Sequence, residues 1–228
     1  MRTRRLALAA AAVTGLLSLT GCGDSLPPGA ASVVNGHTIT RQQVDDLAAA
    51  QCAGVKTASQ QGQGQAVPRK QLTQRALGLL IDIRLNLDYG ASLGLHPRQS
   101  QVTSDYAQVE QLIKALPGRY QGYLSEVFHD WARGRDMVEQ VGEAATGTTA
   151  TAANADQVLN AGYAKRETWL KKDASIDTDP VYAPGKVGWP GEGDSSVSKP
   201  VSSFAKSAGK AQPSASFVSG LPAGQRCG

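Results

Sequence analysis

The spacing of apolar side chains predicts a chain built mainly from helices. The widest apolar face falls in residues 69–93, where one side carries Leu72, Ala76, Leu79, Leu80, Ile83 and Leu87. Leu77 and Ile81 widen this face, which is typical of a helix at the centre of its domain. Pro68 suits the start of this helix, and Gly94 marks its end.

Other segments repeat the helical spacing less strongly. We expect helices over 41–54, 98–116, 119–144 and 155–172, with Pro117-Gly118 separating the middle two and Asn154 capping the last. Residues 56–67, rich in Gln, Gly and Ser, predict a mobile loop. The Ala- and Thr-rich residues 144–153 predict a short link.

The segment V33-V-N-G-H-T-I-T40 specifies its own geometry. Asn35-Gly36 tolerates positive φ at both central positions of a type I′ turn, so the flanking residues predict a short β-hairpin. Thr40 and Gln43 have the spacing of a capping box that starts the first helix. The fold class predicted is mainly α, a multi-helix domain with a short N-terminal hairpin.

The first residues have the pattern of a lipoprotein signal. Arginines at 2, 4 and 5 precede an uncharged run ending in L19-T-G-C22, so cleavage after residue 21 would leave Cys22 to be acylated, for example with palmitate. The alternatives are a plain signal peptide cleaved elsewhere and an uncleaved anchor. Lipidation at Cys22 implies attachment to the extracytoplasmic face of a bacterial cell membrane.

Removal of the signal would leave a chain with nearly balanced charge. The whole chain has 23 Lys plus Arg against 19 Asp plus Glu, and loss of the three signal arginines leaves 20 against 19. This balance gives no reason to expect a nucleic-acid partner. We expect a tether over 22–31, a helical domain over 32–180, and an irregular tail over 181–228 in which about half the residues after 183 are Pro, Gly or Ser.

The cysteines that remain after lipidation are Cys52 and Cys227. An even pair in an oxidising compartment predicts one disulfide, joining the first helix to the end of the chain; two free thiols are the alternative. A metal site is disfavoured, because the sequence has no C-x-x-C or H-x-x-x-H spacing.

Candidate catalytic groups are few and scattered. The histidines are His37, His96 and His129, and Glu126 with His129 forms one E-x-x-H pair, which reads as a surface pair because a di-iron site needs two copies. No nucleophile elbow or phosphate loop is present. We therefore expect no enzyme activity and no cofactor.

Aromatic residues gather in the third and fourth expected helices. They are candidates for contact with apolar client segments, with core packing as the alternative for Tyr106, Phe128 and Trp131. The other two lie off the apolar stripe, which favours exposure. The full candidate set is Tyr106, Tyr120, Tyr123, Phe128 and Trp131.

These features together resemble the SurA-like N-terminal chaperone domain of SurA- and PrsA-type extracytoplasmic foldases. The resemblance rests on V33-V-N-G-H-T-I-T40, on L72-T-Q-R-A-L-G-L-L-I-D-I-R-L-N-L-D-Y-G-A-S-L-G-L95, and on the helix that follows through Leu116. Residues 155–176 resemble the family's returning helix. D179-P-V-Y182 is similar to the family's Asp-Pro-Arg-Tyr-Gly segment, with Val181 in place of arginine and Ala183 in place of glycine.

The resemblance implies a helical cradle that holds unfolded or translocating polypeptides without ATP. Many members insert a parvulin prolyl isomerase between the fourth and fifth helices, and the link over 144–153 is too short for such a domain. The expectation is a lipid-anchored holdase without isomerase activity. The alternative is a structural or adaptor lipoprotein that docks one envelope protein.

Overall fold

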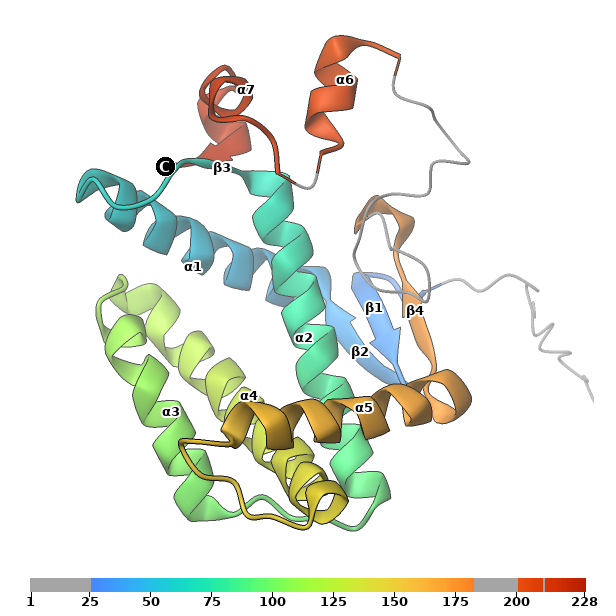
Figure 1. Cartoon of the computed structure of the whole chain (residues 1–228). Coiled ribbons are helices and arrows are strands. Elements are labelled where there is room, and N and C mark those ends of the chain that lie inside the picture. Colours follow the sequence, from blue (N-terminus) through green and yellow to red (C-terminus); the bar gives the residue numbers. More distant parts are fainter. Residues whose placement is uncertain (1–25, 183–200, 211) are drawn as a thin grey trace, which may run out of the picture.

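The structure is a computed structural model that describes residues 26–182, 201–210 and 212–228 (Figure 1). The expected signal, the lipidation site Cys22 and tail residues 183–200 lie outside these ranges. No described helix is long and apolar enough to cross a membrane.

Long helices make up most of the described chain, which confirms the mainly α class. They are α1 (Arg41–Gln60), α2 (Arg69–Ser92), α3 (Gln99–Lys114), α4 (Gly118–Thr146) and α5 (Ala155–Asp173). The short strands are β1 (Ala30–Val34), β2 (His37–Thr40), β3 (Val67–Pro68), β4 (Ile176–Thr178) and β5 (Arg226–Cys227). The remaining short helices are η1 (Pro180–Tyr182), α6 (Ser203–Ala208), α7 (Ala215–Ser219) and η3 (Ala223–Gln225).

The expected hairpin and helix cap are both present. Asn35 and Gly36 have φ values of 49° and 82°, as a type I′ turn requires. The Thr40 side chain accepts from the Gln43 N–H, and the Gln43 side chain accepts from the Thr40 N–H. β4 pairs antiparallel with the other edge of β1, so the chain returns after α5 to complete a sheet of order β2-β1-β4.

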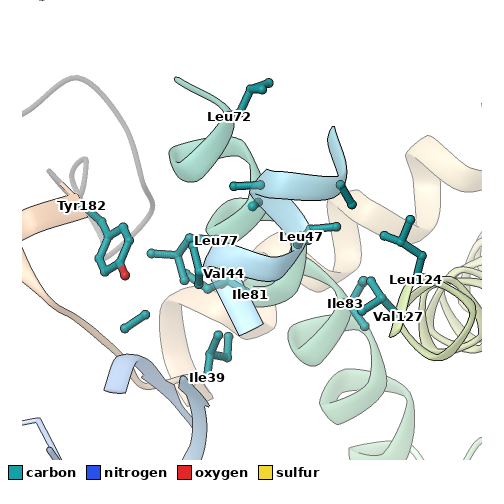
Figure 2. Close-up of a cluster of buried hydrophobic side chains, with 14 of the residues drawn as sticks. Ile39, Val44, Leu47, Leu72, Leu77, Ile81, Ile83, Leu124, Val127 and Tyr182 are labelled. Carbon is teal, nitrogen blue, oxygen red and sulfur yellow. The ribbon is translucent and has the colours of Figure 1, made fainter. Parts of the chain in front are cut away.

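The hydrophobic core lies where α1 and α2 cross beside this sheet. Val44 and Leu47 of α1 face Leu77 and Ile81 of α2, and Tyr182 approaches from the segment after β4 (Figure 2). Leu124 and Val127 extend the same core into α4 (Figure 2). The helix with the widest apolar arc is therefore central, as predicted.

Two helix contacts depend on glycine. α4 and α5 approach at Gly142 and Gly162, where an added Cβ would lie 2.0 Å from the Val158 carbonyl oxygen and 2.1 Å from the Val138 carbonyl oxygen, respectively. α2 and α4 also approach at Gly134, where an added Cβ would lie 2.9 Å from the Asn86 Cβ, while Gly90 makes room for the Met137 side chain of α4. Helix backbones can come this close only where no side chain intervenes.

Buried ion pairs fix the outer helices. Arg166 of α5 donates to the Asp82 carboxylate of α2 at 2.6 Å and also to Asn86. Arg98, just before α3, donates to three carboxylates of α4: Asp136 at 2.6–2.8 Å through its backbone and side chain, and Glu139 and Glu143 at 2.9 Å. These bonds set the positions of α5 on α2 and of α3 on α4.

The first helix is longer than predicted. The expected end near Gly54 was wrong: α1 continues to Gln60, and the positive-φ glycines Gly62 and Gly64 follow it. Gly54 does not adopt the positive φ of a helix end, and an added Cβ there would make only an ordinary contact with the Leu116 side chain at 3.8 Å. The glycine with positive φ that follows the helix is Gly62.

Two smaller expectations also need correction. Asn154 precedes α5 but does not cap it; its side-chain oxygen accepts from the Thr151 N–H at 2.6 Å and so shapes the link. The tail is not irregular throughout its described part, since Ser202 and Ser214 each cap a short helix. Serines that predicted irregularity thus start α6 and α7.

Candidate functional site

An apolar groove lies between α1, α3 and the first half of α4. Its cavity volume is about 490 Å³, and we call it the α1–α3 groove. It is lined by Leu47, Ala50, Gln51, Gly54, Thr57, Ala58 and Gln61 of α1 and its end, Val109, Leu112, Ile113, Ala115 and Leu116 of α3 and its end, and Leu124 and Phe128 of α4.

The sequence of each wall explains the hollow. On α1 the residues that face the groove are small, with Ala50, Gly54 and Ala58 spaced one helical turn apart. No large side chain therefore fills the space in front of this helix. On α3, Val109, Leu112 and Leu116 follow helical spacing along the opposite rim. Leu112 is 70% exposed, unusually so for a leucine beside a core.

One polar atom of the groove lacks a partner. The side-chain oxygen of Gln51 is buried and accepts no hydrogen bond within the described structure. An unpaired buried acceptor is costly, but this oxygen has almost no exposed surface, so a ligand in the groove does not reach it. The groove therefore suits a ligand with apolar side chains, such as an apolar polypeptide segment.

Specific contacts fix the walls of the groove. The Tyr123 hydroxyl of α4 donates to the Gln43 carbonyl oxygen of α1 at 2.9 Å. Burial, reinforced by the Asp46 and Glu126 charges, raises the pKa of Tyr123 to about 12, so the hydroxyl stays a donor at neutral pH. The Arg98 bonds hold the start of α3 in the same way.

The expected disulfide is present and supports the α1 wall. Cys52 and Cys227 are joined with a Cα–Cα distance of 5.2 Å, and β5 pairs with β3 beside them. Cys52 precedes the part of α1 that the sequence predicted to be loop, and Thr57 and Ala58 of that part line the groove. The end of the chain therefore braces this wall.

The five aromatic candidates do not form one surface. Phe128 lines the groove, and its ring packs edge-on against that of Trp131, with ring centroids 6.1 Å apart. Tyr106 stacks on His129 at 3.8 Å and hydrogen-bonds Ser125.

The remaining two tyrosines are only partly exposed. Tyr120 packs beneath Arg119, whose guanidinium carbon lies 4.7 Å from the ring centroid. All five aromatic candidates pack partly against the core, so the fuller exposure expected for Tyr120 and Tyr123 is not observed.

A second, polar cavity of about 490 Å³ lies between α3 and α4 and includes Glu126 and His129. Among the described residues, no group of three or more His, Cys, Asp or Glu side chains is arranged to hold a metal ion. His37 and His96 are exposed in β2 and in the turn before α3, apart from this cavity.

Comparison with known proteins gives no relative: no family model, no curated protein and no solved structure matches this chain.

Sequence reasoning missed most of the groove residues. Leu112 and Gln51 were not singled out from the sequence, and Gly54 was predicted to end the first helix. Their shared surface depends on how α1 and α3 are placed by contacts distant in sequence. The small-residue spacing Ala50, Gly54 and Ala58 was the one available signal.

Proposed function

We propose that this chain is a lipid-anchored extracytoplasmic holdase that binds apolar segments of unfolded or secreted polypeptides in the α1–α3 groove. The observation that carries the proposal is an open apolar groove with an exposed leucine on its rim. Of the five aromatic candidates, Phe128 is the one we assign to the groove.

The lining supports weak and sequence-tolerant binding. Aliphatic walls recognise apolar area and not a particular side chain. Absence of isomerase activity remains part of the proposal.

The SurA-like resemblance also remains a proposal. It is supported by the capped hairpin, the central α2 and the return of the chain through α5 to β4. Lipidation at Cys22 and the extracytoplasmic location rest on the sequence alone.

Suppression of aggregation tests the function directly. The chain from residue 23 onward should reduce light scattering by a model unfolded client at several-fold excess. Leu112→Glu should abolish most of this effect because it places a charge on the groove rim. Leu93→Glu is the matched control, since Leu93 is also exposed (53%) but lies outside the groove at the end of α2.

Equal suppression of aggregation by both variants would show that the α1–α3 groove is not the client-binding site. No suppression by the wild-type chain would remove the holdase function itself.

An adaptor that docks one envelope protein is the second candidate. The observation that favours it is the fixed geometry of the walls, through Tyr123, Arg98 and the disulfide, because a preorganised groove can select one partner. A photo-crosslinking residue at position 112 in membranes distinguishes the two. One dominant product supports the adaptor, whereas a broad set of products supports the holdase.

A further inference from the structure

The C-terminal tail differs in charge from the rest of the mature chain. From Ser195 to Gly228 the sequence contains Lys199, Lys206, Lys210 and Arg226 but no Asp or Glu. Residues 22–194 contain 16 Lys plus Arg against 19 Asp plus Glu. A basic segment is therefore attached to a slightly acidic body.

The described part of the tail has a firmly attached base. Val218 and Leu221 are buried, and Cys227 is bonded to α1. Arg226 donates to the carbonyl oxygen of Ser219, which ties the last strand to the end of α7. α7 and the chain end are therefore fixed to the body.

The outer part of the tail combines exposed apolar and cationic side chains. Phe204 is 59% exposed and Val201 is 86% exposed. α6 lies beside α7 through a ring contact between Phe204 and Phe217, with centroids 5.1 Å apart (Figure 1). Lys206 and Lys210 are exposed, and neither forms an ion pair with any residue that the structure describes.

This combination is the chemistry of contact with an anionic bilayer surface. An aromatic ring gains by entering the headgroup region, and lysines of the same segment are attracted to the negative surface potential. The absence of acidic side chains from 195 onward removes the repulsion that such a surface would otherwise cause. We propose that tail segment 201–210 binds anionic phospholipid headgroups at the membrane through Val201, Phe204, Lys206 and Lys210.

The contact can be weak and still be occupied in the cell. If Cys22 is acylated, the tail is confined near the bilayer, and its effective lipid concentration is high. The inference stands on the tail residues alone and does not depend on what the groove binds. It therefore fails or succeeds separately from the holdase proposal.

Vesicle sedimentation tests the inference on the unlipidated chain from residue 23 onward. We expect binding to vesicles that contain about one-third phosphatidylglycerol, little binding to pure phosphatidylcholine, and loss of binding as NaCl is raised. Lys206→Gln with Lys210→Gln should weaken binding about 25-fold, roughly fivefold for each lysine. Phe204→Ser should weaken it further.

The matched control is Lys171→Gln with Lys172→Gln, which removes two exposed charges from α5. It should leave binding within about twofold of wild type. Equal loss in both double variants would overturn the assignment to the tail, as would equal binding to neutral and anionic vesicles.

Insertion of the ring gives an independent measurement. In a Phe204→Trp variant, brominated lipids in anionic vesicles should quench fluorescence beyond the quenching of wild-type tryptophans. An emission change with polyglutamate but none with vesicles would overturn the lipid assignment and indicate an acidic protein partner.

Discussion

Gly142 and Gly162 let the backbones of α4 and α5 touch. A Cβ on Gly142 would lie 2.0 Å from a backbone oxygen of Val158, which cannot rotate away as a side chain could. We expect Gly142→Ala to push the helices apart and to lower the free energy of unfolding by about 3 kcal/mol. Urea denaturation followed by circular dichroism measures this change.

Gly122 provides the control for that substitution. It lies in the same helix but has open space where a Cβ would be. Gly122→Ala should leave stability unchanged or raise it by up to about 1 kcal/mol, since alanine is the better helix former. If Gly142→Ala had the same urea midpoint of unfolding as wild type, the close approach of α4 and α5 would be contradicted.

Glu139 predicts a pH dependence of stability. Burial raises the pKa of its carboxyl above the ordinary 4.5, and the Asp105 and Glu143 charges add to this, while Arg98 and Arg135 oppose it. The folded state therefore binds this proton more tightly than the unfolded state does. The contribution of Glu139 to stability increases as pH falls through the raised pKa and is lost as pH rises.

The Glu139→Gln variant measures this effect. Its amide oxygen can still accept from Arg98 but does not titrate. Wild type should gain stability relative to the variant as pH is lowered from 7 toward 5, as measured by urea denaturation at each pH. A difference that stays constant across this range would rule out Glu139 as the titrating group.

At the scale of elements, local signals were enough for some predictions and not for others. The hairpin and the start of α1 were predictable because Asn35-Gly36 and the Thr40 cap act on their immediate neighbours. The end of α1 was not, because the sequence does not show which glycine adopts a positive φ, and the helix continues past Gly54 to Gln60 before Gly62. The groove was missed partly for the same reason, since Thr57 and Ala58 of its α1 wall lie in that continuation.

The disulfide should therefore affect the groove wall as well as the tail. Cys227→Ser releases β5 from its covalent tie to α1, and we expect a loss of about 2–5 kcal/mol in the free energy of unfolding. Amide hydrogen exchange should accelerate at residues 55–60, the last turns of α1. Aggregation suppression should fall with it, because those turns line the groove.

Thiol labelling under denaturing conditions provides the chemical check. The oxidised chain from residue 23 should show no free thiol until it is reduced. Labelling of both Cys52 and Cys227 before reduction would contradict the disulfide. Unchanged amide exchange in α1 of Cys227→Ser would show that the disulfide does not support the groove wall.

At the scale of the whole molecule, β1 joins the beginning and the end of the helical body. It pairs with β2 on one edge and with β4 on the other. The Ser32 hydroxyl, buried between β1 and β4, donates to the Asp177 carbonyl oxygen at 2.8 Å. The hydrophobic pattern did not reveal this pairing because β4 is three residues long and too short to show a period.

Asn35 offers a test of how the beginning and the end of the helical body are joined. Its side-chain N–H donates to Asp88 of α2 at 2.9 Å, and its side-chain oxygen accepts from the Ser175 N–H before β4 at 2.8 Å. The sequence assigned Asn35 only the positive φ of a turn. The structure adds a bridge from the turn to α2 and to the returning chain.

Substitutions at Asn35 separate these two roles. Glycine adopts the φ of 49° easily but removes both side-chain bonds, so Asn35→Gly should lower the free energy of unfolding by about 1–2 kcal/mol and accelerate amide exchange over 175–179. Asn35→Asp keeps the acceptor for Ser175 but sets a carboxylate against Asp88, so it should cost more than Asn35→Gly. If Asn35→Gly were as stable as wild type, turn geometry alone would explain this residue, and closure of the body would rest on the β1–β4 pairing.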